Sequence, residues 1–233
     1  MSPTKKALLK GFLDMLPLCL AVIPWGVLCG SLAIQNGFTA IETQAMSLLV
    51  FAGSAQLVAI ELIAGNTPLL TILFTTFIIS SRHFLYGLAV RHKVIAQPLR
   101  WRLPVSFVLT DELFAFSHHR KAYKTKIRLI YALSAGFSFY IAWNIWTLLG
   151  ILAGTILPDL THLGLDFAIA ATFIALVIPG ITNLASLVTV IVAGISATLL
   201  KSSGFELWLV CSALLAMCTG YFTARIVQKK EKR

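Results

Sequence analysis

Residues 167–200 contain no charged side chain, and this run limits the possible folds more than any other feature of the sequence. Its 34 residues suffice for two shorter helices that turn at the motif PGITN (179–183), because about 20 apolar residues cross a bilayer. The rest of the chain is similar in character, since 58% of its 233 residues are hydrophobic and only 12% are charged. A water-soluble domain of this size cannot bury so much apolar surface. The sequence therefore predicts an all-α, multi-pass membrane protein.

The charged residues indicate how the chain is oriented in the bilayer. The net charge is +10, which in a soluble protein would suggest nucleic-acid binding. Here Lys and Arg lie in short loops and tails beside apolar runs, as the positive-inside rule predicts, so we expect no nucleic-acid partner. We expect the C-terminus and the basic loops 91–102 and 118–128 to be cytoplasmic. The loop 158–166 contains acids without Lys or Arg, and we expect it outside.

We expect about six to seven transmembrane helices in a single membrane domain, residues 1–233. Pro and Gly residues interrupt the first apolar segment, and another segment is too short for an easy crossing. The expected spans and interrupted segments are 15–41 (broken), 43–64, 68–90, 103–117 (short), 129–158, 167–200 (two helices) and 206–225.

The two interrupted segments, 15–41 and 103–117, are the candidate solute-binding regions. If both basic loops that flank 103–117 are cytoplasmic, this segment is re-entrant or consists of two half-helices. Irregular backbone at membrane depth is tolerated only against protein or a water-filled cavity. The presence of two interrupted segments favours a solute site between inverted pseudo-repeats, although the halves of the chain share no convincing sequence identity.

Arg82 and His83 lie inside the apolar run 68–90. An ionised side chain near the bilayer centre costs at least about 2.5–3.5 kcal/mol, so these residues need partners. We expect Arg82 to pair with an acid of 103–117 and His83 to relay protons near neutral pH. The alternative is that both residues anchor the helix at the cytoplasmic interface beside Tyr86.

Three carboxylates complete the set of candidate charges within apolar segments. Asp111 and Glu112 are adjacent, so their repulsion should make one of them hold its proton more readily than a solvated acid does. Such a group can carry a proton or bind an ammonium; alternatively, flanking arginines neutralise an interfacial pair. Glu61 is a candidate for proton coupling or for an ion pair with Arg82, unless it only extends to the interface near a helix end.

The sequence offers no arrangement typical of catalysis or metal binding. The motifs HExxH and GxSxG are absent, and no Ser or Cys has a His at a supporting spacing. Four cysteines lie in apolar segments without metal-ligand spacing, which favours buried hydrophobic side chains. We expect no enzyme, no metal and no cofactor.

Three motifs resemble a known family. The motifs FAGSAQL (51–57), SRHFLYG (81–87) and LTDELFA (109–115), in this order and spacing, are similar to those of the AzlC family, the large subunits of bacterial branched-chain amino-acid exporters. The resemblance covers nearly the whole chain. Two departures concern the substrate more than the class: Ser80 and Ser81 stand where the family often has Asn or Asp, and IAATF (169–173) stands where it often has LPALF.

The resemblance implies efflux of leucine, isoleucine, valine and often methionine across the bacterial cytoplasmic membrane. It also implies a small AzlD-like membrane subunit as partner and the proton gradient as driving force. A passive channel, or a structural subunit for another small zwitterionic solute, is the alternative. A zwitterion with an apolar side chain needs partners for its carboxylate and its ammonium, and an apolar pocket. Trp25, Trp143 and Phe114 are candidates to shape that pocket. The candidate substrate-binding residues are Pro24, Gly26, Gly53, Ser54, Gln56 and Asn144.

Overall fold

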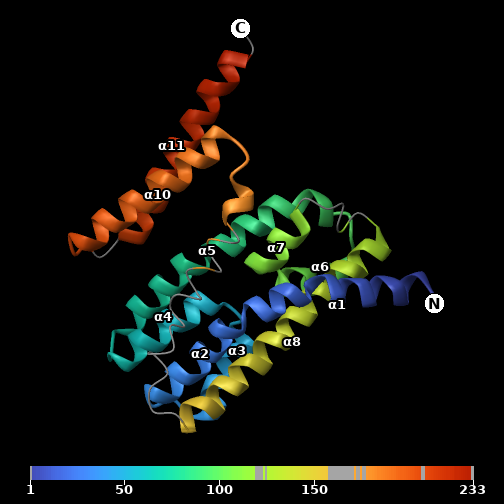
Figure 1. Cartoon of the computed structure of the whole chain (residues 1–233), viewed down its shortest axis with the longest axis vertical. Coiled ribbons are helices and arrows are strands. Elements are labelled where there is room, and N and C mark those ends of the chain that lie inside the picture. The colour runs from blue at the N-terminus through green and yellow to red at the C-terminus, as the bar shows by residue number, and fades with distance from the viewer. Residues whose placement is uncertain are drawn as a thin grey trace. The chain divides into compact units, whose positions relative to one another are not determined.

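The computed structural model describes residues 2–118, 123, 125–156, 171, 174, 177–205 and 208–231, and its regular structure there is helical (Figure 1). The chain divides into two compact units, residues 1–172 and 173–233. The helices of the first unit are α1 (Pro3–Ala21), α2 (Ile23–Gln35), α3 (Ala40–Leu49), α4 (Gly53–Ala64), α5 (Leu69–Val94), α6 (Leu99–Val108), α7 (Asp111–His118) and α8 (Lys126–Ile156). Those of the second are a 3₁₀ turn (Ile178–Gly180), α10 (Leu184–Ser202) and α11 (Trp208–Glu231).

Among these helices, α5, α8 and α10 are each long and apolar enough to cross a membrane. Helices α1 and α2 together would form a fourth crossing, bent by 54°. The interruption expected within 15–41 is therefore present. Pro24 lies in the first turn of α2, where a missing N–H leaves no helix hydrogen bond unmade.

Close packing joins α2 to α8, which lie side by side in Figure 1. Two pairs of glycines at a spacing of four make this approach possible. A Cβ atom at Gly30 would collide with the backbone of Thr147 and Gly150, and one at Gly150 would collide with the backbone of Val27. Gly154 in turn faces the backbone of Ser31. Small residues at these positions let two helix backbones approach closely, as is common between helices in membranes.

The predicted continuous span 43–64 is wrong, because α3 ends at Leu49 and α4 begins only at Gly53. Phe51 has a φ of 46°, which is uncommon for a bulky residue. Its ring is buried and meets the edge of Tyr140 at a centroid distance of 4.9 Å. Burial of this aromatic ring against α8 favours the break, and no local sequence pattern announces it.

The short segment 103–117 forms two half-helices, which is one of the two alternatives predicted from the sequence. Helix α6 ends at Val108, and α7 begins at Asp111 after the two buried residues Leu109 and Thr110. The spans expected at 68–90 and 129–158 correspond to α5 and α8. The acidic loop 158–166 lies outside the described residues.

The second unit contains a helical hairpin. Helix α10 starts with a capping box, in which the Asn183 side chain accepts from the Ser186 N–H at 2.8 Å. This start agrees with the turn expected at 179–183. Gly220 of α11 leaves room for the Thr189 side chain of α10, so small residues again let two helices pack closely.

Candidate functional site

An ion pair joins two of the predicted charges. Arg82 of α5 places one guanidinium nitrogen 2.7 Å from Oδ2 of Asp111, the first residue of α7. The same guanidinium donates a hydrogen bond of 2.7 Å to Oγ of Ser54, in the first turn of α4. The negative charge of Asp111 at a helix N-terminus is further stabilised by the helix dipole. Pairing and hydrogen bonding together offset the cost of these charges in an apolar environment.

Aromatic rings border this ion pair on α5 and α7. The ring of Tyr86 stacks on Phe114 at a centroid distance of 4.5 Å. His83 meets Tyr86 edge-on at 5.9 Å, and its Nδ1 lies 3.1 Å from the carbonyl oxygen of Ser80. The site therefore combines a charged pair with an adjacent apolar surface, which is what a solute with a charged and an apolar part requires.

A second polar cluster lies where α3, α4 and α8 meet. Nε2 of Gln56 donates to Oγ of Ser47 at 2.9 Å, and that hydroxyl lies 2.8 Å from Oγ1 of Thr147. All three side chains are buried. Nearby, Nε2 of Gln44 donates to Oδ1 of Asn144 at 2.9 Å. These hydrogen bonds join α4 to α3 and α3 to α8.

Three polar atoms of this region have no hydrogen-bond partner within the part of the chain that the structure describes. They are Oε1 of the half-buried Gln44, Oε1 of Gln56 and Nε1 of Trp143, and the last two side chains are fully buried. The benzene side of the Trp143 indole lies against Gly53, so closely that a Cβ there would stand 2.7 Å from it. One acceptor and one donor thus remain available for hydrogen bonds near the start of α4. Buried polar groups without partners are rare and need an explanation, one of which is a functional role.

The structure brings together part of the predicted residue set. Ser54, Arg82 and Asp111 meet directly. Gln56 lies one turn after Gly53 on α4. Glu112 follows Asp111 in the first turn of α7, and its side chain is half-buried.

Other predicted residues lie apart from this ion pair or have structural partners. Glu61 is exposed and lies in the last turn of α4. Gly26 packs against Trp146 of α8, and its N–H donates to the carbonyl of Val22. Asn144 is held by Gln44. The roles assigned to these residues in binding or coupling stay predictions.

Sequence reasoning missed a contact between α1 and α8. The Tyr131 hydroxyl donates to Oδ2 of Asp14 at 2.6 Å. The sequence did contain a signal for this contact, because Asp14 is an isolated acid within an apolar run. Intramembrane acids are candidate functional residues by default. Gln44 was also missed, because its partner lies 100 residues away in the sequence.

Broken helices, apolar surfaces and a partly buried ion pair define the class of this protein as an integral membrane protein built around internal polar sites. The family model described as AzlC protein matches residues 17–157. This chain belongs to the AzlC family, which is associated with membrane transport rather than catalysis.

Three relatives illustrate the range of similarity. An uncharacterized membrane protein of Archaeoglobus fulgidus is 35% identical over 176 residues, 74% of this chain and 75% of that protein. Inner membrane protein YgaZ of Escherichia coli is 27% identical over 157 residues, 66% of this chain and 64% of that protein. Branched-chain amino acid transport protein AzlC of Bacillus subtilis is 26% identical over 153 residues, 66% of this chain and 59% of that protein. No solved structure shows a significant match.

Proposed function

We propose that this chain exports leucine, isoleucine, valine and methionine across the bacterial cytoplasmic membrane, together with a small AzlD-like subunit and driven by protons. The relative from Bacillus subtilis, whose name specifies branched-chain amino acid transport, supports this class of substrate. The observation that carries the proposal is the Arg82–Asp111 ion pair, held at the first turns of the half-helices α4 and α7.

The ion pair has the chemistry that an amino-acid zwitterion needs. The substrate carboxylate would replace Asp111 as a partner of Arg82, with Ser54 in the same hydrogen-bonding group. The substrate ammonium would take the position of the guanidinium beside Asp111. Phe114 and Tyr86 offer apolar surface to a branched side chain. Because substrate and ion pair compete for the same groups, binding would open the contact between α5 and α7.

Proton coupling follows from the same exchange. In the interval in which neither the guanidinium nor the substrate ammonium faces Asp111, the acidic pair Asp111–Glu112 lacks a neutralising charge. Two neighbouring carboxylates then favour uptake of one proton. Release of substrate and return of Arg82 would favour loss of that proton. In this cycle, each exchange of Arg82 for substrate is linked to uptake and loss of one proton by the Asp111–Glu112 pair.

The test is efflux of preloaded, labelled leucine, valine and methionine from cells, or from membrane vesicles of defined orientation. This chain would be expressed alone and with its small subunit, with and without a protonophore. We expect efflux that needs both chains and stops when the proton gradient collapses. Efflux that persists without the gradient would support a passive channel instead. No efflux of these solutes, with both chains in the membrane, would contradict the proposed substrate.

Variants of the ion pair connect this activity to the site. Arg82→Gln and Asp111→Asn should each reduce efflux by about tenfold or more, because each leaves the other member of a partly buried pair uncompensated. Arg100→Gln removes an exposed arginine of α6 and serves as the matched control with unchanged efflux. Membrane levels of all variants are measured in parallel. Normal efflux in Asp111→Asn would remove this carboxylate from the mechanism.

A further inference from the structure

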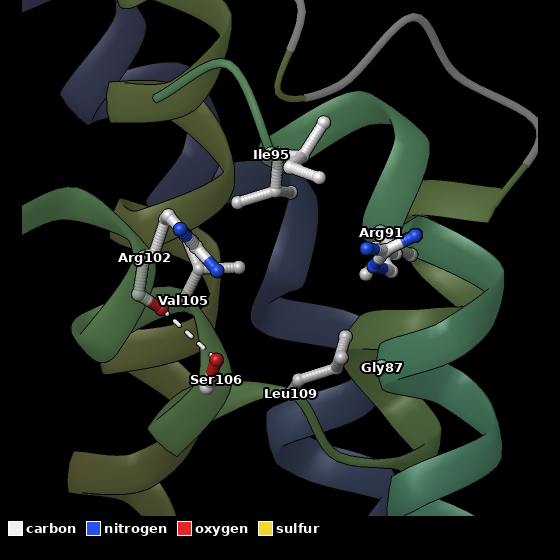
Figure 2. Close-up of a pocket in the computed structure, with 9 residues that line it drawn as sticks. Gly87, Arg91, Ile95, Arg102, Val105, Ser106 and Leu109 are labelled. Carbon is white, nitrogen blue, oxygen red and sulfur yellow. Dashed lines mark hydrogen bonds between the residues drawn. The ribbon is translucent and has the colours of Figure 1, made fainter. Parts of the chain in front are cut away.

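A pocket of about 110 Å³ lies between α5 and α6 in the first unit (Figure 2). Its walls include the buried side chains of Val90, Val105 and Leu109. Gly87 also lines it, and a Cβ at this position would have no atom within 4 Å. The contacts described for the Arg82–Asp111 pair use none of these residues, so the pocket needs its own explanation.

Two arginines give the pocket its charge. Figure 2 shows Arg91 of α5 and Arg102 of α6 on opposite sides of it, and both side chains are exposed. No acidic side chain is among the residues that line it in the described part of the chain. Ser106 adds a hydroxyl, which donates to the backbone carbonyl of Arg102 at 3.0 Å. Two guanidinium groups facing one pocket without a carboxylate form a site for an anion, and phosphate fits their forked donors especially well.

Exposed apolar side chains continue from the pocket along the same helices. Leu99 and Leu103 are one turn apart on α6 and are 62% and 61% exposed. Ile95, which lines the pocket, is also exposed. Exposed apolar side chains of a membrane protein are suited to contact acyl chains. The surface therefore presents a cationic pocket next to an exposed apolar strip, which matches the two parts of a phospholipid.

We propose that the pocket formed by Arg91 and Arg102 binds the phosphate group of an anionic membrane phospholipid, with the acyl chains against Leu99 and Leu103. A basic pocket between transmembrane helices at the cytoplasmic side is a recognised mode of headgroup binding. The lipid would fix the end of α5 to α6, and α6 leads through Leu109 and Thr110 to Asp111. This inference depends on the membrane location of the chain and not on which solute it transports.

The test uses the purified full-length chain and measures bound lipid by native mass spectrometry during titration. The probes are phosphatidylglycerol, phosphatidylcholine with the same acyl chains, glycerol phosphate and inorganic phosphate. We expect phosphatidylglycerol to bind at least about tenfold more tightly than phosphatidylcholine, because only the former keeps a net charge for the arginines. The double variant Arg91→Gln/Arg102→Gln should abolish that preference.

Arg100→Gln is the matched control, because it removes one exposed arginine from the same helix without touching the pocket. It should keep the preference for phosphatidylglycerol. The double variant Arg91→Lys/Arg102→Lys keeps both positive charges of the pocket but removes the forked guanidinium donors. Thermal unfolding verifies that each variant is folded. An equal loss in Arg100→Gln would overturn the proposal in favour of general charge attraction. Equal binding of glycerol phosphate or inorganic phosphate would overturn the lipid assignment and indicate a free-anion site.

Discussion

The amide of Gln56 is buried and makes a hydrogen bond to another side chain at one end only. Its Nε2 donates to Ser47, whereas its Oε1 has no partner in the part of the chain that the structure describes. A buried acceptor without a partner costs about 1–3 kcal/mol. An amide kept at such a cost, close to the start of α4, is a candidate for contact with a transported solute.

Gln56→Met tests this role, because methionine has a similar length and no amide. We expect the free energy of unfolding to change by less than about 1.5 kcal/mol, since one hydrogen bond and one unmet acceptor disappear together. Efflux should still fall by about tenfold if the amide binds the solute. Thermal unfolding and efflux of labelled leucine are measured on the same preparations. Gln35→Met, at an exposed position, is the control; a parallel loss of stability and efflux would indicate a purely structural role for Gln56.

Arg82 shows how far the sequence defined the site. A cation within an apolar helix needs an anion, and the acids of 103–117 were the natural partners, so the pairing was predictable. The sequence did not predict that Asp111, and not its neighbour Glu112, makes the 2.7 Å contact with Arg82. It also did not predict that Ser54 joins this pair. Both depend on where α4 and α7 begin, which tertiary packing decides.

At the level of helices, two kinds of feature control the architecture: breaks and close contacts. The breaks after α1, α3 and α6 place helix starts inside the unit, and each start presents N–H groups with a positive dipole. The close contact between α2 and α8 holds the scaffold against which those starts are positioned. Rigidity of this scaffold is therefore a condition for the geometry of the site.

Gly30→Ala should destabilise the α2–α8 contact, because the added Cβ would meet backbone and not a movable side chain. We expect a loss of about 1–3 kcal/mol in the free energy of unfolding, as for other overpacked interfaces. Gly194→Ala in α10 is the matched control, since a Cβ there has no atom within 4 Å. It should be neutral or stabilising by about 0.5–1 kcal/mol, because alanine favours a helix interior. Equal stability of the two variants by thermal unfolding would contradict the close contact.

The capping box of α3 predicts a pH dependence. The Thr39 N–H and hydroxyl donate to the Glu42 carboxylate at 2.8 and 2.7 Å. These hydrogen bonds hold the pKa of Glu42 below its usual 4.5. A lowered pKa in the folded state means that the stabilisation is present above the unfolded pKa and is lost as pH falls through the folded one.

We therefore expect the first turn of α3 to lose protection when the pH falls from about 6 to about 3, the range over which glutamate titrates. Amide hydrogen exchange, corrected for the intrinsic rate at each pH, measures this change. Glu42→Gln can still accept from Thr39 but does not titrate, so its protection should depend less on pH. The same pH profile in both proteins would exclude Glu42 as the cause.

For the whole chain, the distribution of Lys and Arg predicts an orientation that the helices alone do not define. The segment 95–98 between α5 and α6 is flanked by Arg91, Lys93, Arg100 and Arg102. The short half-helices α6 and α7 allow the chain to enter the membrane and return to the same side. Both basic loops can then be cytoplasmic without a violation of the positive-inside rule.

Single-cysteine labelling with a membrane-impermeant reagent tests this orientation, in a background from which the four native cysteines have been removed. Cysteines at Ala96 and near the C-terminus should react only in inside-out vesicles or permeabilised cells. A cysteine in the loop 158–166 should react in intact cells. Labelling of Ala96→Cys and the loop 158–166 from the same side would contradict the predicted topology.

Composition and hydropathy by themselves determined that the chain is a helical membrane protein, where its longest spans lie, and that charges within those spans need partners. These properties follow from the cost of exposing apolar surface to water and charges to lipid, which acts on every residue locally. Only the tertiary structure decided that 43–64 breaks at Phe51, that Gln56 donates to Ser47 and Ser47 contacts Thr147, and that Arg82 bridges Ser54 and Asp111. These contacts join residues from different helices. They depend on which side chains can pack into one shared interior, and no local pattern in the sequence records that choice.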